Sequence, residues 1–382
     1  MPQASLWVLS VTEQGFSSAG RSARLFEPDT LAISKSGTIG RLGILKDRMC
    51  GNRAVINIRP RQEVCDPRFL FYTLLENRGE IIARAEGSVQ KNLYVSALSS
   101  IAVPWRPLEE QREIAATLGA LDDKIEVNRR MAATLEEMAR ALYRSWFVDF
   151  DPVHAKAQGR APAHMDPATA ALFPDRFGDD GLPEGWETGT LGDIARNRRD
   201  QVQPAAIDPE TPYVGLEHMP RRSIAIGDWG KAGEVGSAKS RVSEGSFLFG
   251  KLRPYFHKVG LAPVDGICST DILVVEPMES VWSGLVLSVI SSSAFVEHAN
   301  ATSSGTRMPR ANWGDMARYE IVMPDRKIAD AFRDKVAPMH ARIVQSIHEN
   351  RTLAALRDAL LPKLMSGELR VREAEAQVEQ VA

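Results

Sequence analysis

The stretch Ile114-Ala-Ala-Thr-Leu-Gly-Ala-Leu-Asp-Asp-Lys-Ile-Glu-Val-Asn-Arg-Arg130 decides the fold. Its large apolar residues recur alternately four and three positions apart, which is the heptad spacing of a helix that packs along another helix. A second stretch, residues 325–365, repeats this spacing, so we predict two long helices, 107–147 and 325–365. The predicted contact residues are Ile114, Leu118, Leu121, Ile125, Leu135, Met138 and Leu142 in the first helix, and Phe332, Val336, Ile343, Ile347, Leu353, Leu360 and Leu364 in the second.

Each helix also carries an asparagine on its apolar face, Asn128 in the first and Asn350 in the second. A polar residue at such a position can simply be tolerated near the helix surface. Two of them in corresponding places favour a pair that fixes the register at some expense in stability. Because each lies near the middle of its helix, antiparallel pairing would bring them together. We therefore predict an antiparallel coiled coil with Asn128 and Asn350 as its register residues.

The composition fits a globular protein of two domains. The chain has 382 residues, 44% of them hydrophobic and 25% charged, with a net charge of −2. No apolar run approaches the roughly 20 residues that span a bilayer, and the first residues lack the pattern of a signal peptide. We expect a cytoplasmic protein with no membrane contact. Cys50, Cys65 and Cys268 form no Cys-x-x-Cys pair and are expected to be free buried thiols.

The predicted fold class is α+β, with two mixed α/β domains separated by the two long helices. Apolar runs in each globular part predict strands at 31–34, 42–45, 54–58, 246–249 and 272–275, and helices at 67–85 and 284–299. The predicted boundaries are a first globular domain at 1–106, a central helix at 107–150, a linker with local order at 151–181, a second globular domain at 182–324, a distal helix at 325–367 and a flexible tail at 368–382.

The two globular parts also resemble each other. Ile33-Ser-Lys35 with Gly43 corresponds to Phe249-Gly-Lys251 with Gly260, and Glu86-Gly-Ser-Val-Gln-Lys-Asn-Leu93 corresponds to Ser304-Gly-Thr-Arg-Met-Pro-Arg310. Between these anchors the sequences differ widely. A shared frame with divergent surfaces is expected of two modules that recognise different things.

No catalytic constellation is evident. Gly245-Ser-Phe-Leu-Phe-Gly250-Lys251-Leu252 is one residue from a phosphate-binding loop, which needs Ser or Thr after the lysine to hold magnesium. Its interior is apolar and typical of a strand that leads into a turn. The seven histidines are scattered and predict no metal site.

Basic residues beside glycines and hydroxyls are a better signal. Such loops suit phosphate contacts from Lys and Ser and base-edge contacts from Arg, Gln and Asn. Any one of them alone can be an ordinary solvated turn, but their repetition at matching positions favours a binding role. The predicted DNA-binding residues are Lys35, Ser36, Arg41, Ser88, Gln90, Lys91, Asn92, Lys239, Arg241, Lys251, Arg253, Tyr255, Thr306, Arg307 and Arg310.

Several long motifs carry a resemblance to a known family. They are Pro107-Leu-Glu-Glu-Gln-Arg-Glu-Ile-Ala115, Leu118 to Arg130, Met138-Ala-Arg-Ala-Leu-Tyr-Arg-Ser-Trp-Phe-Val-Asp-Phe-Asp-Pro152, Leu182-Pro-Glu-Gly-Trp-Glu187 and Leu360-Leu-Pro-Lys-Leu-Met-Ser-Gly-Glu368. In this order they resemble the central and distal repeats of the specificity subunits of type I restriction-modification systems. The resemblance covers about residues 30–370.

The resemblance implies two target recognition domains, which read the two parts of a split double-stranded DNA sequence. It also implies that methyltransferase subunits dock on the helices and that a motor-nuclease subunit joins them. This chain would be a non-catalytic subunit without a cofactor of its own, while S-adenosylmethionine, ATP and magnesium would bind to the partners. The alternative is a scaffold that binds methyltransferase subunits, or dimerises through its coiled coil, without full DNA recognition.

One departure from the family pattern concerns the first domain. In the second domain 65 residues separate Trp186 from Lys251, whereas only 34 residues precede Lys35. We expect the first domain to be shortened at its N-terminal side, which puts its DNA recognition in question and makes a homodimer with two identical second domains conceivable.

Overall fold

The computed structural model describes residues 16–18, 24–87, 91–305 and 307–379. The chain divides into two compact units. Unit 1 comprises Met1–Glu126 and Asn350–Ala382, and unit 2 comprises Val127–Glu349. The division falls within both long helices, so each unit holds one end of each helix.

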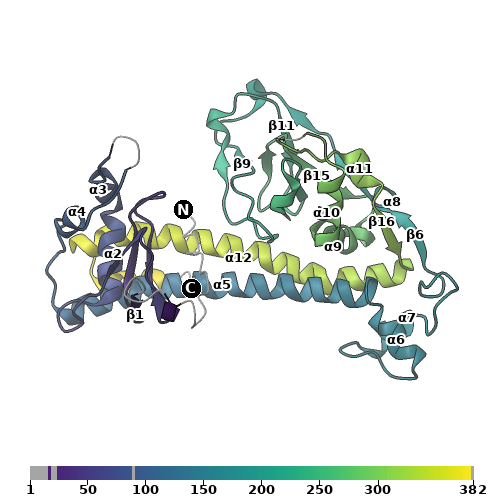
Figure 1. Ribbon diagram of the computed structural model, residues 1–382, viewed down its shortest axis with the longest axis horizontal. Coiled ribbons are helices and arrows are strands. Elements are labelled where there is room, and N and C mark those ends of the chain that lie inside the picture. The colour runs from purple at the N-terminus through teal and green to yellow at the C-terminus, as the bar shows by residue number, and fades with distance from the viewer. Residues whose placement is uncertain (1–15, 19–23, 88–90, 306, 380–382) are drawn as a thin grey trace. The chain divides into compact units, whose positions relative to one another are not determined.

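The two long helices are α5, Leu108–Phe147, and α12, Arg326–Ser366 (Figure 1). Both predictions are confirmed to within one residue. In unit 1, Arg106 donates to the carbonyl of Met365 and Arg357 to Asp122. In unit 2, Asn128 donates to Glu349, and the ring of Phe147 lies 4.9 Å from that of Phe332. In each unit rising numbers on one helix meet falling numbers on the other, so the paired segments are antiparallel.

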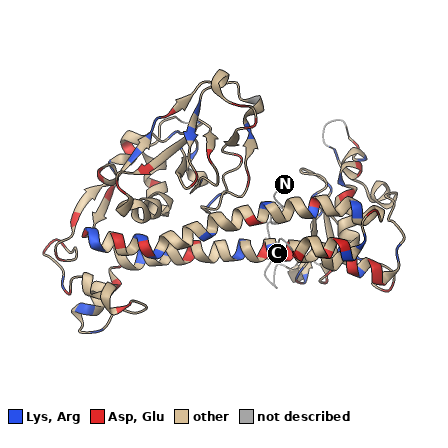
Figure 2. Ribbon diagram, turned by 180° about the vertical axis from the view of Figure 1, so that it is seen from behind, with Lys and Arg blue, Asp and Glu red and all other residues tan. Residues whose placement is uncertain are grey.

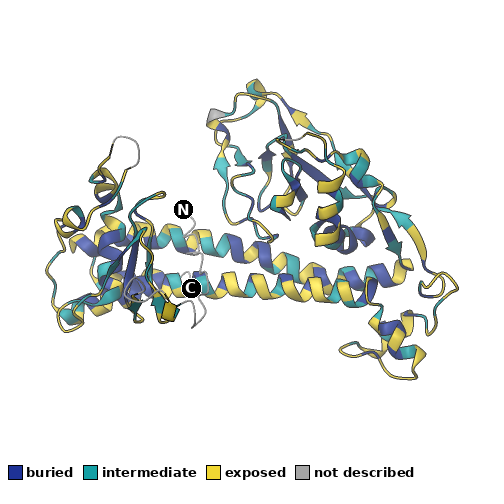
Figure 3. Cartoon of the chain, viewed as in Figure 1, coloured by how far each residue is buried: buried dark blue, intermediate teal, exposed yellow. Residues whose placement is uncertain are grey.

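The contact face of α5 follows the heptad spacing through its whole length. Ile114, Leu118, Leu121, Ile125 and Asn128 are at most 4% exposed, and the same steps then reach Ala132 and Ala139, which are also buried. Figure 3 shows buried and exposed residues alternating along both helices. The prediction for Met138 is wrong, since it is 50% exposed. The contact face instead includes its neighbour Ala139. A search for regularly spaced large apolar residues does not detect such a small side chain.

On α12 the predicted contact residues from Phe332 to Leu364 are all buried. Asn350 is half-buried and belongs to unit 1, whereas Asn128 belongs to unit 2. In unit 2 the Asn128 amide donates to Glu349 Oε2 at 3.0 Å. The pairing of Asn128 with Asn350 stays a prediction.

Unit 1 contains an antiparallel sheet in the order β3-β2-β5, with helices beside it. The predicted helix at 67–85 is two helices, α2 and α3, which meet at Asn77. Asp66 begins α2 by accepting hydrogen bonds from the backbone of Arg68 and Phe69. The elements are β1 Leu25–Phe26, β2 Leu31–Ser34, β3 Leu42–Ile44, β4 Met49–Cys50, β5 Val55–Ile58, α2 Pro67–Glu76, α3 Arg78–Ala83, α4 Val95–Ser99 and α13 Val371–Glu379.

The expected flexible tail is corrected by α13. Its Ala374 and Val378 are buried in the apolar core of unit 1. The charged composition of this segment hid a one-sided apolar pattern that anchors the helix.

Unit 2 contains a four-stranded sheet in the order β13-β12-β15-β7, a five-stranded sheet in the order β10-β9-β14-β11-β8, and the pair β16-β6. The predicted helix at 284–299 is two helices, α9 and α10, which bend by 64° at Ser292. The strands are β6 Glu187–Thr190, β7 Ala195–Arg198, β8 Gln201–Val202, β9 Pro212–Val214, β10 Gly230–Lys231, β11 Lys239–Val242, β12 Phe247–Gly250, β13 Val259–Leu261, β14 Gly266–Cys268, β15 Ile272–Pro277 and β16 Glu320–Met323. The helices are α6 Asp151–Ala157, α7 Pro167–Leu172, α8 Leu191–Ile194, α9 Ser283–Ser291, α10 Ser293–Ala301 and α11 Trp313–Ala317, with short 3-10 turns at Pro204–Ala206, Ala232–Glu234, Pro254–Phe256 and Ser280–Trp282.

The two units share one strand order. The order β3-β2-β5 of unit 1 matches β13-β12-β15 of unit 2, and the pair Ala32 and Gly43 matches Leu248 and Gly260. The small pair β1-β4 likewise matches β11-β14, because Leu25 faces Cys50 as Arg241 faces Ile267. The predicted common frame is therefore present.

The segment 151–181, predicted as a linker with local order, contains α6 and α7. Its Val153 and Phe173 are buried in the core of unit 2, where Phe173 lies edge-to-face with Trp146. The cysteine prediction holds for Cys268, which is buried. It is wrong for Cys50, which is exposed on the short edge strand β4, and Cys65 is intermediate.

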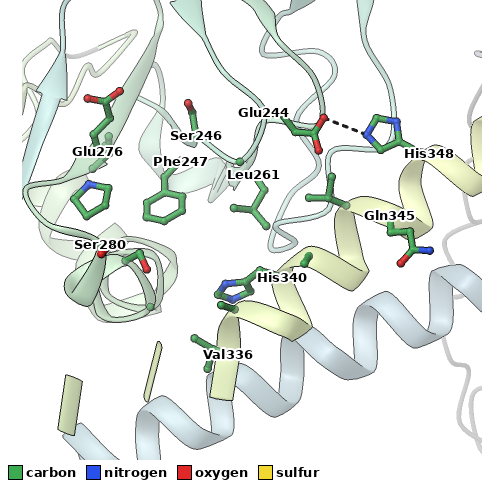
Figure 4. A pocket seen from close by; sticks show the side chains of 18 residues that line it. Glu244, Ser246, Phe247, Leu261, Glu276, Ser280, Val336, His340, Gln345 and His348 are labelled. Atoms are coloured by element: carbon green, nitrogen blue, oxygen red, sulfur yellow. Dashed lines mark ion pairs between the residues drawn. The ribbon is translucent and has the colours of Figure 1, made fainter. Parts of the chain in front are cut away.

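A cavity of about 880 Å³ lies in unit 2 between the sheet and α12 (Figure 4). Phe247, Leu261 and Val336 form part of its apolar wall, and His340 of α12 points into it. At the rim, Glu244 pairs with His348 at 3.7 Å. Burial lowers the pKa of His340 to about 4, so this imidazole is neutral near pH 7.

Replacing His340 with glutamine should make unit 2 less sensitive to acid. A histidine with a lowered pKa binds its proton more readily in the unfolded chain, so its contribution to stability falls as the pH drops from about 6.5 toward about 4. From these values the wild type should lose about 2 kcal/mol more than the variant between pH 7 and pH 5. Urea unfolding followed by tryptophan fluorescence at both pH values measures this. An equal loss in both proteins would contradict the assignment.

Candidate nucleic-acid interface

Two loops of unit 2 that the sequence predicts as DNA-binding lie against each other. The Arg253 backbone N–H donates to the carbonyl of Pro309 at 2.7 Å, and the Ala311 N–H donates to Lys251 at 3.0 Å. Leu252 also forms a bridge with Arg310. The loops 251–257 and 303–310, about fifty residues apart in sequence, therefore form one surface at the end of β12.

The side chains of this surface are basic and aromatic. Tyr255 is 50% exposed and stacks edge-to-face on Phe256, while Arg307 is exposed. Arg310 pairs with Asp271 at 3.4 Å, which orients its guanidinium while leaving it more than half exposed. An exposed ring beside guanidinium groups can contact both bases and phosphates.

Arg253 is held in an unusual conformation. Its φ is +52°, and its half-buried side chain has an Nε that is buried without a hydrogen-bond partner. His257, four residues on, has a φ of +50°. Strained backbone of this kind persists where the surroundings impose it, and it clusters at functional sites.

Unit 1 brings its own predicted loops together by the same contacts. Leu93 donates its N–H to Lys35 at 2.8 Å, as Ala311 does to Lys251. Lys35 donates to Ala54 at 2.9 Å, as Lys251 does to Asp271. The bridge between Glu86 and Asn92 repeats the bridge between Ser304 and Arg310.

The loop that follows β2 is tightly closed. The Ser34 hydroxyl donates to the carbonyl of Thr38 and accepts from the Arg41 N–H, and Arg78 donates to Gly40 at 2.8 Å. Gly37 and Gly40 have φ of +70° and +77°, which glycine adopts without strain. Arg41 and Lys91 are exposed and Lys35, Ser36 and Asn92 are half-buried, while Ser88, Gln90 and Thr306 lie outside the described residues.

Lys239 and Arg241 have different environments. Lys239 is only 7% exposed, and its Nζ donates to the carbonyl and hydroxyl of Ser237. The expectation that it faces DNA is therefore corrected: its Nζ also lies 5.9 Å from the centre of the Tyr213 ring, and the side chain is buried among these neighbours. Arg241 is exposed on the same strand, 3.9 Å from Asp200.

A basic pair that the sequence did not predict lies beside the loop 251–257. Arg221 and Arg222 are exposed, and the Arg221 guanidinium lies 4.0 Å from the centre of the Phe256 ring. The Arg222 N–H donates to His257 at 2.8 Å. Adjacent arginines after Pro220 were the available signal, but about thirty residues separate them from the loop they contact.

Charge in this area affects its neighbours. Burial and then Arg221 lower the pKa of Lys258. Burial is also the main cause of the lowered pKa of His257, which Arg222 lowers further although the Ser291 carbonyl opposes it. On the long helices, by contrast, Lys and Arg are interspersed with Asp and Glu (Figure 2).

The described residues contain no group of three or more His, Cys, Asp or Glu that could hold a metal. Residues 245–252, compared above with a phosphate-binding loop, form strand β12 and the turn after it, as predicted. In the described part of the chain no single helix is long and apolar enough to span a membrane; one bent pair, Ser280–Ser291 with Ser293–Ala301, passes by length and composition only.

Comparison with known proteins shows what the chain is similar to. Residues 16–137 match the family described as "Type I restriction modification DNA specificity domain". The chain is 26% identical to the MjaIX specificity subunit of Methanocaldococcus jannaschii, a type I restriction enzyme, over 92% of this chain and 80% of that protein. Along most of its length the chain is thus similar to the specificity subunits of type I restriction enzymes.

A second relative is the HindI specificity subunit of Haemophilus influenzae, another type I restriction enzyme, with 25% identity over 82% of this chain and 79% of that protein. Among solved structures, the type I restriction-modification S subunit of M. genitalium is 17% identical and covers 88% of this chain and 83% of its own, with a TM-score of 0.49. The relatives carry the match along most of the chain, beyond the segment that the family description covers.

Proposed function

We propose that this specificity subunit reads a bipartite site in double-stranded DNA, with loops 34–41 and 86–93 of unit 1 contacting one part and loops 251–257 and 303–310 of unit 2 contacting the other. The observation that carries the proposal is the repeated contact between paired loops, Lys35 with Leu93 and Lys251 with Ala311. Matching backbone contacts that present different side chains suit the reading of two different half-sites.

The chain acts as a non-catalytic partner in a larger complex. Its relatives are named specificity subunits of restriction enzymes, which supports a role in directing other subunits to DNA. Methyltransferase subunits would dock along α5 and α12, and a motor-nuclease subunit would join them. S-adenosylmethionine, ATP and magnesium belong to those partners in this proposal.

Replacing Lys251 or Arg253 with alanine tests the unit 2 part of the surface. Each change should weaken duplex binding by about 1–3 kcal/mol, and loss of a phosphate contact should reduce the slope of log affinity against log salt by about 1. Fluorescence anisotropy with the purified full chain and a labelled duplex, measured over a salt series, gives both values.

Arg176→Ala is the matched control, because Arg176 is exposed and lies in the segment 151–181, before the second globular domain. Its guanidinium pairs with Glu184. It should bind DNA as the wild type does. Unchanged affinity and salt slope in both loop variants would remove Lys251 and Arg253 from the interface.

A further inference from the structure

A buried carboxylate on helix α5 contacts the backbone next to the basic pair in unit 2. The side chain of Glu136 is only 9% exposed. Its Oε2 accepts hydrogen bonds from the Ser223 hydroxyl at 2.9 Å and from the Ile224 N–H at 3.1 Å, and its Oε1 accepts from Arg140 at 2.8 Å. A carboxylate taken out of water stays ionised only when such partners are present.

The segment that Glu136 holds is the one that presents Arg221 and Arg222. Arg222 has a φ of +57°, and its N–H donates to His257 at 2.8 Å. Immediately after it, Ser223 and Ile224 are fixed by Glu136, and the Ile224 carbonyl accepts from Leu261 in β13 at 2.9 Å. Arg222, Arg253 and His257 are thus three positive-φ residues in one cluster of contacts.

The two guanidinium groups are poised for an anion. Within the described residues neither has a carboxylate partner within salt-bridge distance, in contrast to Arg196, Arg198 and Arg310 of the same unit. The Arg221 guanidinium lies 4.0 Å from the centre of the Phe256 ring, a cation–π contact that restricts the side chain, and Arg221 is exposed to solvent. The adjacent Tyr255 is exposed, so Arg221 and Arg222 extend the surface formed by the loops 251–257 and 303–310.

We infer that Arg221 and Arg222 bind DNA phosphate, and so add a third contact segment to the loops 251–257 and 303–310 of unit 2. Glu136 of α5 is the positioning residue that holds the two arginines beside the loop 251–257. The inference rests on the proposed DNA reading and adds residues to it. It also means that the geometry of this contact depends on helix α5 itself.

The test is a double-mutant cycle on the full chain, with anisotropy of a fluorescein-labelled 30-base-pair duplex of mixed sequence as the readout, over a salt series. Arg221→Ala with Arg222→Ala should weaken binding at least about tenfold at about 0.1 M salt and reduce the salt slope by about 2, one for each phosphate contact. Glu136→Ala should weaken binding by about five- to tenfold. In the background without both arginines, Glu136→Ala should change affinity by less than about twofold, because a positioning residue has nothing left to position.

Two further variants keep the cycle interpretable. Glu137→Ala removes an exposed carboxylate that pairs with the same Arg140 but does not contact the segment 221–224. This variant should bind DNA as the wild type does. Glu136→Gln keeps the shape and one acceptor oxygen, so it should fold and show an intermediate loss.

The inference is overturned if the wild type binds the duplex and the arginine double variant binds equally well, or if Glu136→Ala weakens binding by the same factor with and without the arginines. If the wild type and the Lys251 variant show the same negligible binding, the proposed DNA reading fails instead.

Discussion

Replacing Arg357 with alanine is expected to lower the free energy of unfolding by about 3–5 kcal/mol, because it leaves a partly buried acid without its partner. Arg357 is 8% exposed on α12, and it donates to Asp122 of α5 at 2.5 Å and to Asp358 at 2.7 Å. Asp122 also accepts from the Tyr72 hydroxyl at 2.7 Å, so the same carboxylate joins three helices of unit 1. Urea unfolding followed by helical circular dichroism measures the loss.

Two variants of the same site serve as controls. Asp358→Ala removes the exposed partner and should cost less than about 0.5 kcal/mol. Arg357→Met keeps the apolar stem and should cost less than the alanine change, because an apolar side chain can fill the space. A loss in Arg357→Ala no larger than in Asp358→Ala would contradict the pairing of α5 with α12 in unit 1.

Replacing Phe332 with alanine is expected to lower the free energy of unfolding by about 3–5 kcal/mol, the cost of removing a fully buried aromatic ring. Phe332 is 0% exposed, and its ring lies 4.9 Å from Phe147 and 5.7 Å from Trp146. These contacts join α12 to the end of α5 in unit 2. Tryptophan fluorescence during urea unfolding reports the change, because Trp146 belongs to the same cluster.

Met138→Ala is the matched control for this prediction. The spacing of large apolar residues placed Met138 on the contact face, whereas the structure leaves it 50% exposed. Its replacement should therefore change stability by less than about 0.5 kcal/mol. A large loss for Met138→Ala together with a small loss for Phe332→Ala would mean that the helix register is wrong.

Much of the fold could be predicted because it depends on local pattern. The heptad spacing located both long helices to within one residue, and the apolar runs at 31–34 and 272–275 located strands β2 and β15. The repeated motifs around Lys35 and Lys251 predicted that the two globular parts share one backbone arrangement. The same motifs correctly selected the loops that the structure brings together.

What the sequence could not predict depends on contacts between distant segments. Lys239 was counted among DNA-binding residues by its charge, but Ser237 and Tyr213, the latter distant in sequence, lie against its side chain and bury it. Arg221 and Arg222 were overlooked since their position beside Tyr255 depends on a hydrogen bond to His257. The buried position of Glu136 likewise depends on its hydrogen bond from Ser223, 87 residues away in the sequence.

Mapping of methylated bases across the genome, in cells with the gene, without it and with it restored, tests most directly the claim that this chain reads a bipartite DNA site. We predict that one methylated motif, made of two short parts with a fixed gap, is lost on deletion and returns on restoration. Methylation that is the same in all three strains, in cells that express the chain and its methyltransferase partners, would contradict the claim.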